Sequence, residues 1–114
     1  ILDKIKIVWY TLGIMVKVLT IENFNEETKN GVCVIDFWAS WCGPCRMLSP
    51  VIDELSEEHP EVKFYKVNVD EASDLAQAFG ISSIPAVFKI SGGKIIARHV
   101  GYAPKAAVAS ALGL

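Results

Sequence analysis

The chain has 114 residues, of which 52% are hydrophobic and 10% aromatic, and its net charge at pH 7 is −2. This length fits one domain with one hydrophobic core, and the apolar content excludes an intrinsically disordered chain. The charge balance gives no basic footprint for nucleic acid, so we expect no nucleic-acid partner. Three cysteines are too few for a disulfide scaffold and suit a reducing compartment, which predicts a cytoplasmic protein.

The first fourteen residues form a mostly apolar segment that we expect to lie outside the domain. Its uncharged stretch, residues 7–16, is shorter than the roughly 20 residues that span a bilayer, so we expect no membrane association of the domain itself. We interpret residues 1–14 as an extension that comes from expression or upstream translation, because Met15 stands where a domain could begin. A truncated export or anchor segment and an added edge strand are the alternatives. The domain then covers residues 15–114.

Apolar periodicity and turn residues predict nine elements in the order βαβαβαββα. Strands are expected at residues 16–20, 32–38, 62–69, 86–90 and 94–100. Helices are expected at residues 23–30, from the cysteine pair past residue 55, at 72–79 and at 104–112. The early strands alternate with helices and should pair in parallel, whereas the last two, joined by a short turn, must be antiparallel. We therefore expect an α/β protein with a mixed sheet.

The most informative motif is Trp41-Cys42-Gly43-Pro44-Cys45, which connects the apolar strand to the next helix. Two residues between cysteines on the first turn of a helix bring the thiols together, as in a redox dithiol. Free N–H groups and the positive end of the helix stabilise a thiolate there. We expect Cys42, at the exposed start, to be the nucleophile and Cys45 to be the resolving thiol. Gly43 should let the backbone turn tightly, and Pro44 is tolerated in a first turn.

A zinc site and a purely structural disulfide are the alternatives for this motif. Zinc normally takes four ligands, and the other candidates, Cys33, His59 and His99, are scattered singly along the chain. A disulfide that closes a four-residue loop constrains little chain entropy. We expect no metal, an inert buried thiol at Cys33 and no catalytic role for either histidine.

Asp36 is notable because its neighbours on the predicted strand are apolar. Burial of a lone carboxylate should raise its pKa. Asp36 precedes Cys42 by six residues, at the carboxyl end of the strand, so it can lie beneath the dithiol and act as the general base for Cys45. The alternative is a buried ion pair with Lys66 on the next strand. The two roles can coexist, because Lys66 would tune the same proton.

Over about residues 16–113 the chain resembles the thioredoxin family. The matching residues are Asp36-Phe37-Trp38-Ala39-Ser40-Trp41-Cys42-Gly43-Pro44-Cys45, Pro50, Lys66, Ile84-Pro85 and Gly101. The resemblance implies the thioredoxin fold, a central five-stranded mixed sheet flanked by four helices. It also implies that Ile84-Pro85 is a cis-proline loop facing the dithiol, whose backbone pairs with an extended substrate segment.

An apolar docking surface beside Cys42 would suit many different protein disulfides. The expected members are Trp41, Gly43, Pro44, Ile84, Pro85, Val100, Gly101 and Tyr102. Taken singly, each of these residues could equally be ordinary core or loop packing. Tyr102 stands where the family often has a smaller residue, so the shape of the groove should differ there.

Together these features predict a protein-disulfide reductase that works through a mixed disulfide on Cys42, which Cys45 then resolves. Gly43-Pro44 adds no positive charge or side-chain donor beside the thiolate, which favours a reductant over an oxidant. We expect a monomer with no bound cofactor, and the resemblance implies that its Cys42–Cys45 disulfide is reduced by a thioredoxin reductase that uses NADPH or ferredoxin. The alternatives are an exported thiol oxidase or isomerase and a binding subunit whose redox activity is secondary.

Overall fold

The computed structural model describes residues 16–114, and the extension expected at residues 1–14 lies outside them. The strands are β1 (Val16–Val18), β2 (Val32–Trp38), β3 (Lys63–Asn68), β4 (Ala86–Ser91) and β5 (Lys94–Val100). The helices are α2 (Phe24–Thr28), α3 (Gly43–Glu58), α4 (Ser73–Ala78) and α5 (Lys105–Leu112). The predicted order of elements is confirmed, with β1 and α2 each shorter than expected.

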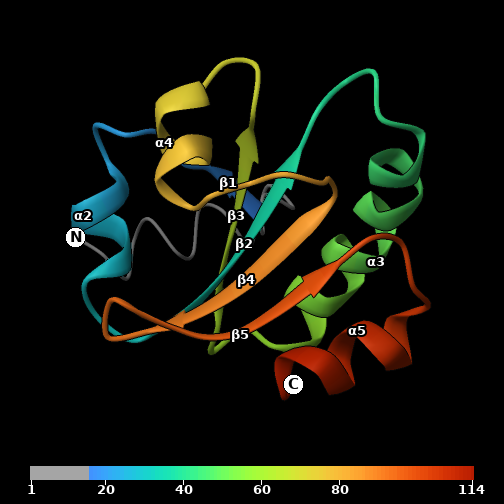
Figure 1. The fold of residues 1–114 in the computed structure, drawn as a ribbon. Helices are drawn as coiled ribbons and strands as arrows, with labels where there is room; N and C mark the ends of the chain where they lie inside the picture. The colour runs from blue at the N-terminus through green and yellow to red at the C-terminus, as the bar shows by residue number, and fades with distance from the viewer. Residues whose placement is uncertain (1–15) are drawn as a thin grey trace.

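The five strands form one mixed sheet in the order β1-β3-β2-β4-β5 (Figure 1). β3 lies parallel to both β1 and β2, whereas β4 is antiparallel to β2 and to β5. β2 occupies the centre, which explains its nearly continuous apolar sequence, because helices cover both of its faces. The predicted α/β class and mixed pairing are confirmed.

Each face of the sheet carries two helices (Figure 1). On one face, α2 and α4 pack on a cluster in which the rings of Phe37, Phe79 and Phe88 lie 5.0–5.6 Å apart. On the other face, α3 and α5 contribute Leu48, Ile52, Leu55, Val108 and Leu112 to a second buried cluster. Side chains alternate along a strand, so Asp36 shares the α3–α5 face with Val34, which belongs to the second cluster.

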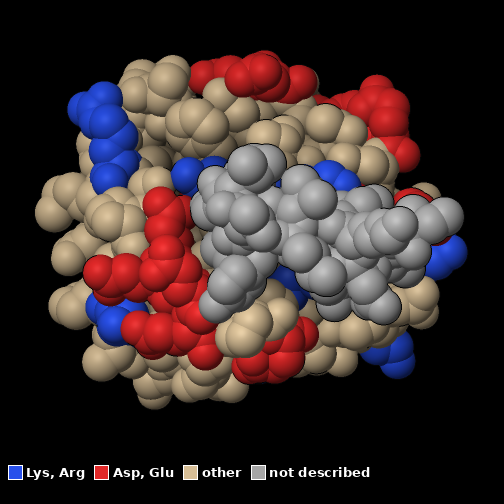
Figure 2. Space-filling view, turned by 180° about the vertical axis from the view of Figure 1, so that it is seen from behind, with Lys and Arg blue, Asp and Glu red and all other residues tan. Residues whose placement is uncertain are grey.

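The surface seen in Figure 2 carries acidic side chains in several groups and basic side chains scattered between them. This distribution agrees with the small negative net charge of the chain. In the part of the chain that the structure describes, no helix is both long and apolar enough to cross a bilayer.

Candidate active site

The two cysteines of the CxxC motif form a disulfide at the start of α3, with their Cα atoms 5.3 Å apart. Cys42 is the N-cap residue of the helix, and its Sγ accepts a hydrogen bond of 3.2 Å from the Cys45 backbone N–H. Pro44 lies in the first helical turn, where it removes no intrahelical hydrogen bond. The sulfur of Cys42 therefore already receives a donor from the helix end, the kind of contact that stabilises a thiolate.

Two expectations about this loop are wrong for the disulfide form. Cys42 is only 5% exposed, against 3% for Cys45, because Ala39, Trp38, Val69 and Ile84 pack around the pair. Gly43 does not have a positive φ, and a Cβ added to it would meet nothing within 4 Å. The first turn of α3 thus does not depend on the conformational freedom of glycine.

Asp36 is 2% exposed and lies two residues before the end of β2, on the face covered by α3. Burial raises the pKa of its carboxyl group from 3.8 to about 7, a rise that Lys66 partly offsets and Asp53 reinforces. Lys66 is the direct partner of Asp36 in the β2–β3 register. Its Nζ donates to Ser49 Oγ at 3.0 Å, and no ion pair within 4.0 Å joins it to Asp36. The two groups are electrostatic neighbours rather than a contact ion pair.

The loop before β4 brings a distant part of the chain to the disulfide. The Ile84–Pro85 peptide bond is cis, and the carbonyl oxygen of Ile84 lies 3.8 Å from Cys42 Sγ. The Gly101 backbone N–H donates to the Pro85 carbonyl at 2.8 Å, which ties the end of β5 to this loop. Gly101 has φ of +90°, a conformation that side-chain-bearing residues rarely adopt.

Three expected members of the docking surface are large and exposed. Trp41 is 67% exposed, Val100 53% and Tyr102 45%. Pro44 is also exposed, Gly43, Ile84 and Gly101 are half-buried, and Pro85 is buried. Among these residues, the Cys42–Ile84 contact and the Gly101–Pro85 hydrogen bond join the three loops around the disulfide.

The structure shows two polar contacts at this site that were not predicted from the sequence. The Trp41 indole Nε1–H donates to Asp70 Oδ2 at 2.8 Å, which fixes the exposed ring. Asp70 follows β3, the neighbour of β2, so the meeting of parallel strand ends could have suggested the pair. Ser49, the acceptor for Lys66, lies one turn beyond Cys45 on α3 and left no signal in the sequence.

The remaining cysteine and the two histidines lie on separate elements. Cys33 is a buried free thiol on β2, and burial raises its pKa to about 11. The His59 ring lies 3.2 Å from Glu61 at the far end of α3, and His99 lies on β5. Within residues 16–114, no three metal-ligating side chains are grouped to hold an ion. The zinc alternative thus has no ligand set in the described residues.

Comparisons of both the sequence and the structure with known proteins find thioredoxins. A model of the thioredoxin family matches residues 15–113. Thioredoxin from Listeria monocytogenes is 44% identical over 80% of this chain and 89% of the relative. Thioredoxin from Bacillus subtilis is 41% identical over 78% of this chain and 86% of the relative. The solved structure of Malassezia sympodialis thioredoxin superposes with a TM-score of 0.76 at 39% identity, over 86% of this chain and 89% of that one.

Proposed function

The chain belongs to the thioredoxin family and is a thiol–disulfide oxidoreductase that reduces protein disulfides, and we propose how its residues divide that reaction. The observation that carries the proposal is the Cys42–Cys45 pair at the start of α3, with the Cys45 N–H directed at Cys42 Sγ. Cys42 is the attacking nucleophile, because the helix end stabilises the thiolate at this position.

The reaction proceeds in two exchanges. The Cys42 thiolate attacks one sulfur of a substrate disulfide, forms a mixed disulfide with it, and releases the other substrate sulfur as a thiolate. Cys45 then loses its proton to Asp36 and attacks Cys42 Sγ. This step forms the Cys42–Cys45 disulfide and frees the second substrate thiolate, which takes a proton from water. Two electrons have passed to the substrate, and Asp36 returns its proton before the next cycle.

Asp36 suits the role of general base because its pKa is near neutrality, where a group can both accept and release a proton. Lys66 tunes this group through its charge, since it opposes the rise in the pKa of Asp36. An extended substrate segment would lie along Trp41, Ile84, Val100 and Tyr102, with the backbone next to Pro85 pairing with it.

The assignment as a protein-disulfide reductase also leads to a proposed electron donor and cellular compartment. We assign the return of electrons to a thioredoxin reductase that uses NADPH or ferredoxin, since the chain carries no dinucleotide-binding fingerprint. A monomer in the cytoplasm suits a protein that keeps Cys33 as a free thiol. Gly43-Pro44 places no cation beside the thiolate, which opposes the oxidase alternative. Residues 15–114 are the domain that carries these functions.

Reduction of insulin disulfides by single-cysteine variants tests the assignment. Cys42→Ser should lose turnover and form no covalent adduct, whereas Cys45→Ser should lose turnover but accumulate a mixed disulfide with substrate. Cys33→Ser is the matched control, because this buried thiol lies away from the pair, and it should keep full turnover. Turnover that survives in both active-site variants would contradict the dithiol mechanism. An adduct on Cys45 in the Cys42→Ser variant would reverse the two roles.

A further inference from the structure

Two buried side-chain atoms in the described residues have no hydrogen-bond partner, Asp36 Oδ1 and His99 Nε2. Buried polar atoms are nearly always hydrogen-bonded, so such an atom indicates an ordered water or a functional group. One of the two belongs to the proposed general base. The other belongs to His99, for which the sequence predicts no catalytic role.

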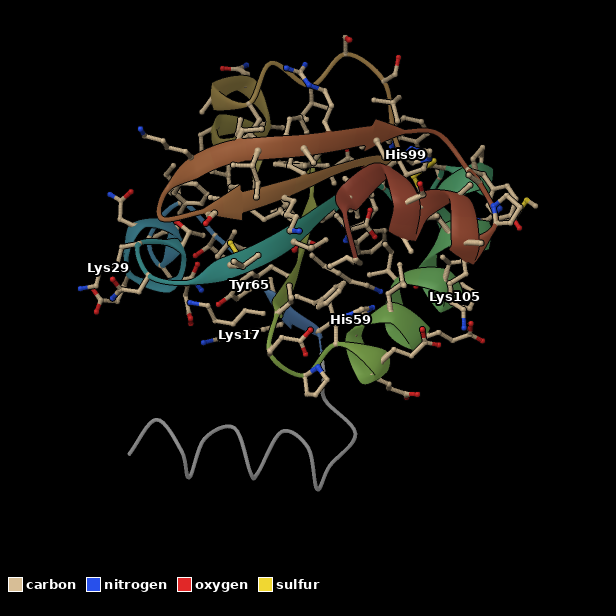
Figure 3. The ribbon with its side chains drawn as sticks, turned by 90° about the horizontal axis from the view of Figure 1, so that it is seen from below. Lys17, Lys29, His59, Tyr65, His99 and Lys105 are labelled. Carbon is tan, nitrogen blue, oxygen red and sulfur yellow. A yellow bond between two sulfur atoms is a disulfide. The ribbon has the colours of Figure 1, made fainter. Side chains whose placement is uncertain are left out.

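The register of the sheet places both residues in one row. Asp36 on β2 is the direct partner of Val87 on β4, and Val87 is the direct partner of His99 on β5. Direct partners point to the same face, and Val87 belongs to the buried cluster beneath α3 and α5. Asp36 and His99 therefore share that face, and Figure 3 shows His99 near the end of β5, beside α5.

The distance between Asp36 and His99 along this row bears on whether a water can connect them. Adjacent strands lie about 4.8 Å apart, so two strand steps separate the Cα atoms of Asp36 and His99 by roughly 10 Å. In the sheet register Val87 stands between them, and its short side chain has no polar atom. A water that bridges this row needs polar partners on both sides of it, and the carboxyl and imidazole groups are such partners.

We propose that His99 Nε2 and Asp36 Oδ1 share an ordered water, and that through it His99 exchanges the proton of Asp36 with solvent. The inference rests on the proposed role of Asp36 as the base for Cys45. The water donates to one group while it accepts from the other. A proton that leaves Asp36 thus arrives on Nε2, and the imidazole releases one from its other nitrogen, since His99 is only half-buried.

The other charged groups near this row are poorly suited to the same task. Lys66, on the opposite side of Asp36, donates to Ser49, and an ammonium group cannot accept a proton. Asp53 on α3 acts on Asp36 only as a nearby charge that raises its pKa. His99 supplies the one imidazole in the row.

The charged side chains on the elements around His99 contact groups other than His99. Lys89 on β4 donates to the Gly113 carbonyl at 3.3 Å, beyond the end of α5. Lys105 on α5 forms ion pairs with Glu54 and Glu58 of α3. Arg98, next to His99 on β5, lies over the Phe88 ring on the opposite face.

The test compares His99→Gln, His99→Ala and the matched control His59→Gln in the full chain. His59 is the other histidine of the chain, and it lies at the end of α3, away from the Asp36–Val87–His99 row. Insulin turnover is measured from pH 5.5 to 8.5. Both His99 variants should lose turnover near neutral pH on the order of tenfold, less than the roughly hundredfold or greater loss that removal of a general base causes. Imidazole added to the buffer should restore His99→Ala, and His59→Gln should match the parent chain.

A second measurement follows the Asp36 carboxyl group by NMR in the reduced protein. Because His99 is the second partner of the shared water, its loss should shift the pKa of Asp36 in both His99 variants. Unchanged turnover and an unchanged Asp36 titration in both His99 variants would overturn the inference. A loss in His99→Ala that imidazole does not restore would also overturn it, because a packing defect has no need of a proton carrier.

Asp36→Asn separates this inference from the function on which it rests. If Asp36→Asn is slow while the His99 variants are not, Asp36 remains the base and only the role of His99 fails. If Asp36→Asn keeps the turnover and pH profile of the parent chain, the proposed base fails and the inference fails with it.

Discussion

Replacing Asp36 by Asn should stabilise the oxidised protein in a strongly pH-dependent way. Burial raises the pKa of this carboxyl group from 3.8 to about 7. The folded chain therefore binds more protons than the unfolded chain between these two values, and the free energy of unfolding falls as the pH rises through them. At about 1.4 kcal/mol per pKa unit, the ionised group costs the folded state about 4 kcal/mol above pH 7. Asn fills a similar volume and has no such titration.

Urea denaturation of the oxidised chain at pH 4 and pH 8.5 measures this effect. The Asp36→Asn variant should differ little from the parent chain at pH 4 and should be more stable by about 4 kcal/mol at pH 8.5. That increment corresponds to roughly 20 °C in midpoint temperature for a domain of this size. Glu57→Gln, which removes an exposed carboxylate from α3, is the control and should give the same small change at both pH values. A stability gain of equal size at pH 4 and pH 8.5 would refute the argument, because it would not come from ionisation.

Three further predictions concern Lys66, Pro44 and Leu48. Lys66→Met should raise the pKa of Asp36 further, since the Lys66 charge opposes the rise, and an NMR titration that shows a lower value would contradict this account. Pro44→His should raise the reduction potential of the Cys42–Cys45 disulfide, by about 30 mV for each tenfold gain in stability of the reduced form; a redox titration with no rise would count against the effect of an added cation. Leu48→Ala, at a fully buried position on α3, should cost about 2–5 kcal/mol in urea denaturation, and a loss below 1 kcal/mol would mean that the site collapses around the deletion.

Some features of the site could be predicted from residues that are close together in the sequence, and others could not. The dithiol could be predicted because the cysteine spacing and the strand before it are adjacent in the chain. The burial of Asp36 could also be predicted, since its strand is apolar on both sides of it, and so could Lys66 as its neighbour, because parallel strands that follow one another tend to pair. Each of these inferences uses residues within one or two consecutive elements.

The Asp36–Val87–His99 row had no such local signal. It depends on which strands lie beside β2 and in which register, and pairing across the sheet is decided by packing of the whole core. The low exposure of Cys42 has the same origin, because the residues that cover it come from three separate loops.

The sequence by itself determined the order of the elements, the family and the chemistry of the two thiols, because periodicity, turn residues and motif spacing act over a few residues. Only the tertiary structure decided the surroundings of that chemistry. The strand order β1-β3-β2-β4-β5 places β2 at the centre of the sheet, so its one carboxyl group is withdrawn from water, beside the lysine of one neighbouring strand and two strands from a histidine. That placement sets the pKa of Asp36 near neutrality, since burial and the charges nearby, rather than the identity of the residue, determine when a carboxyl group gives up its proton.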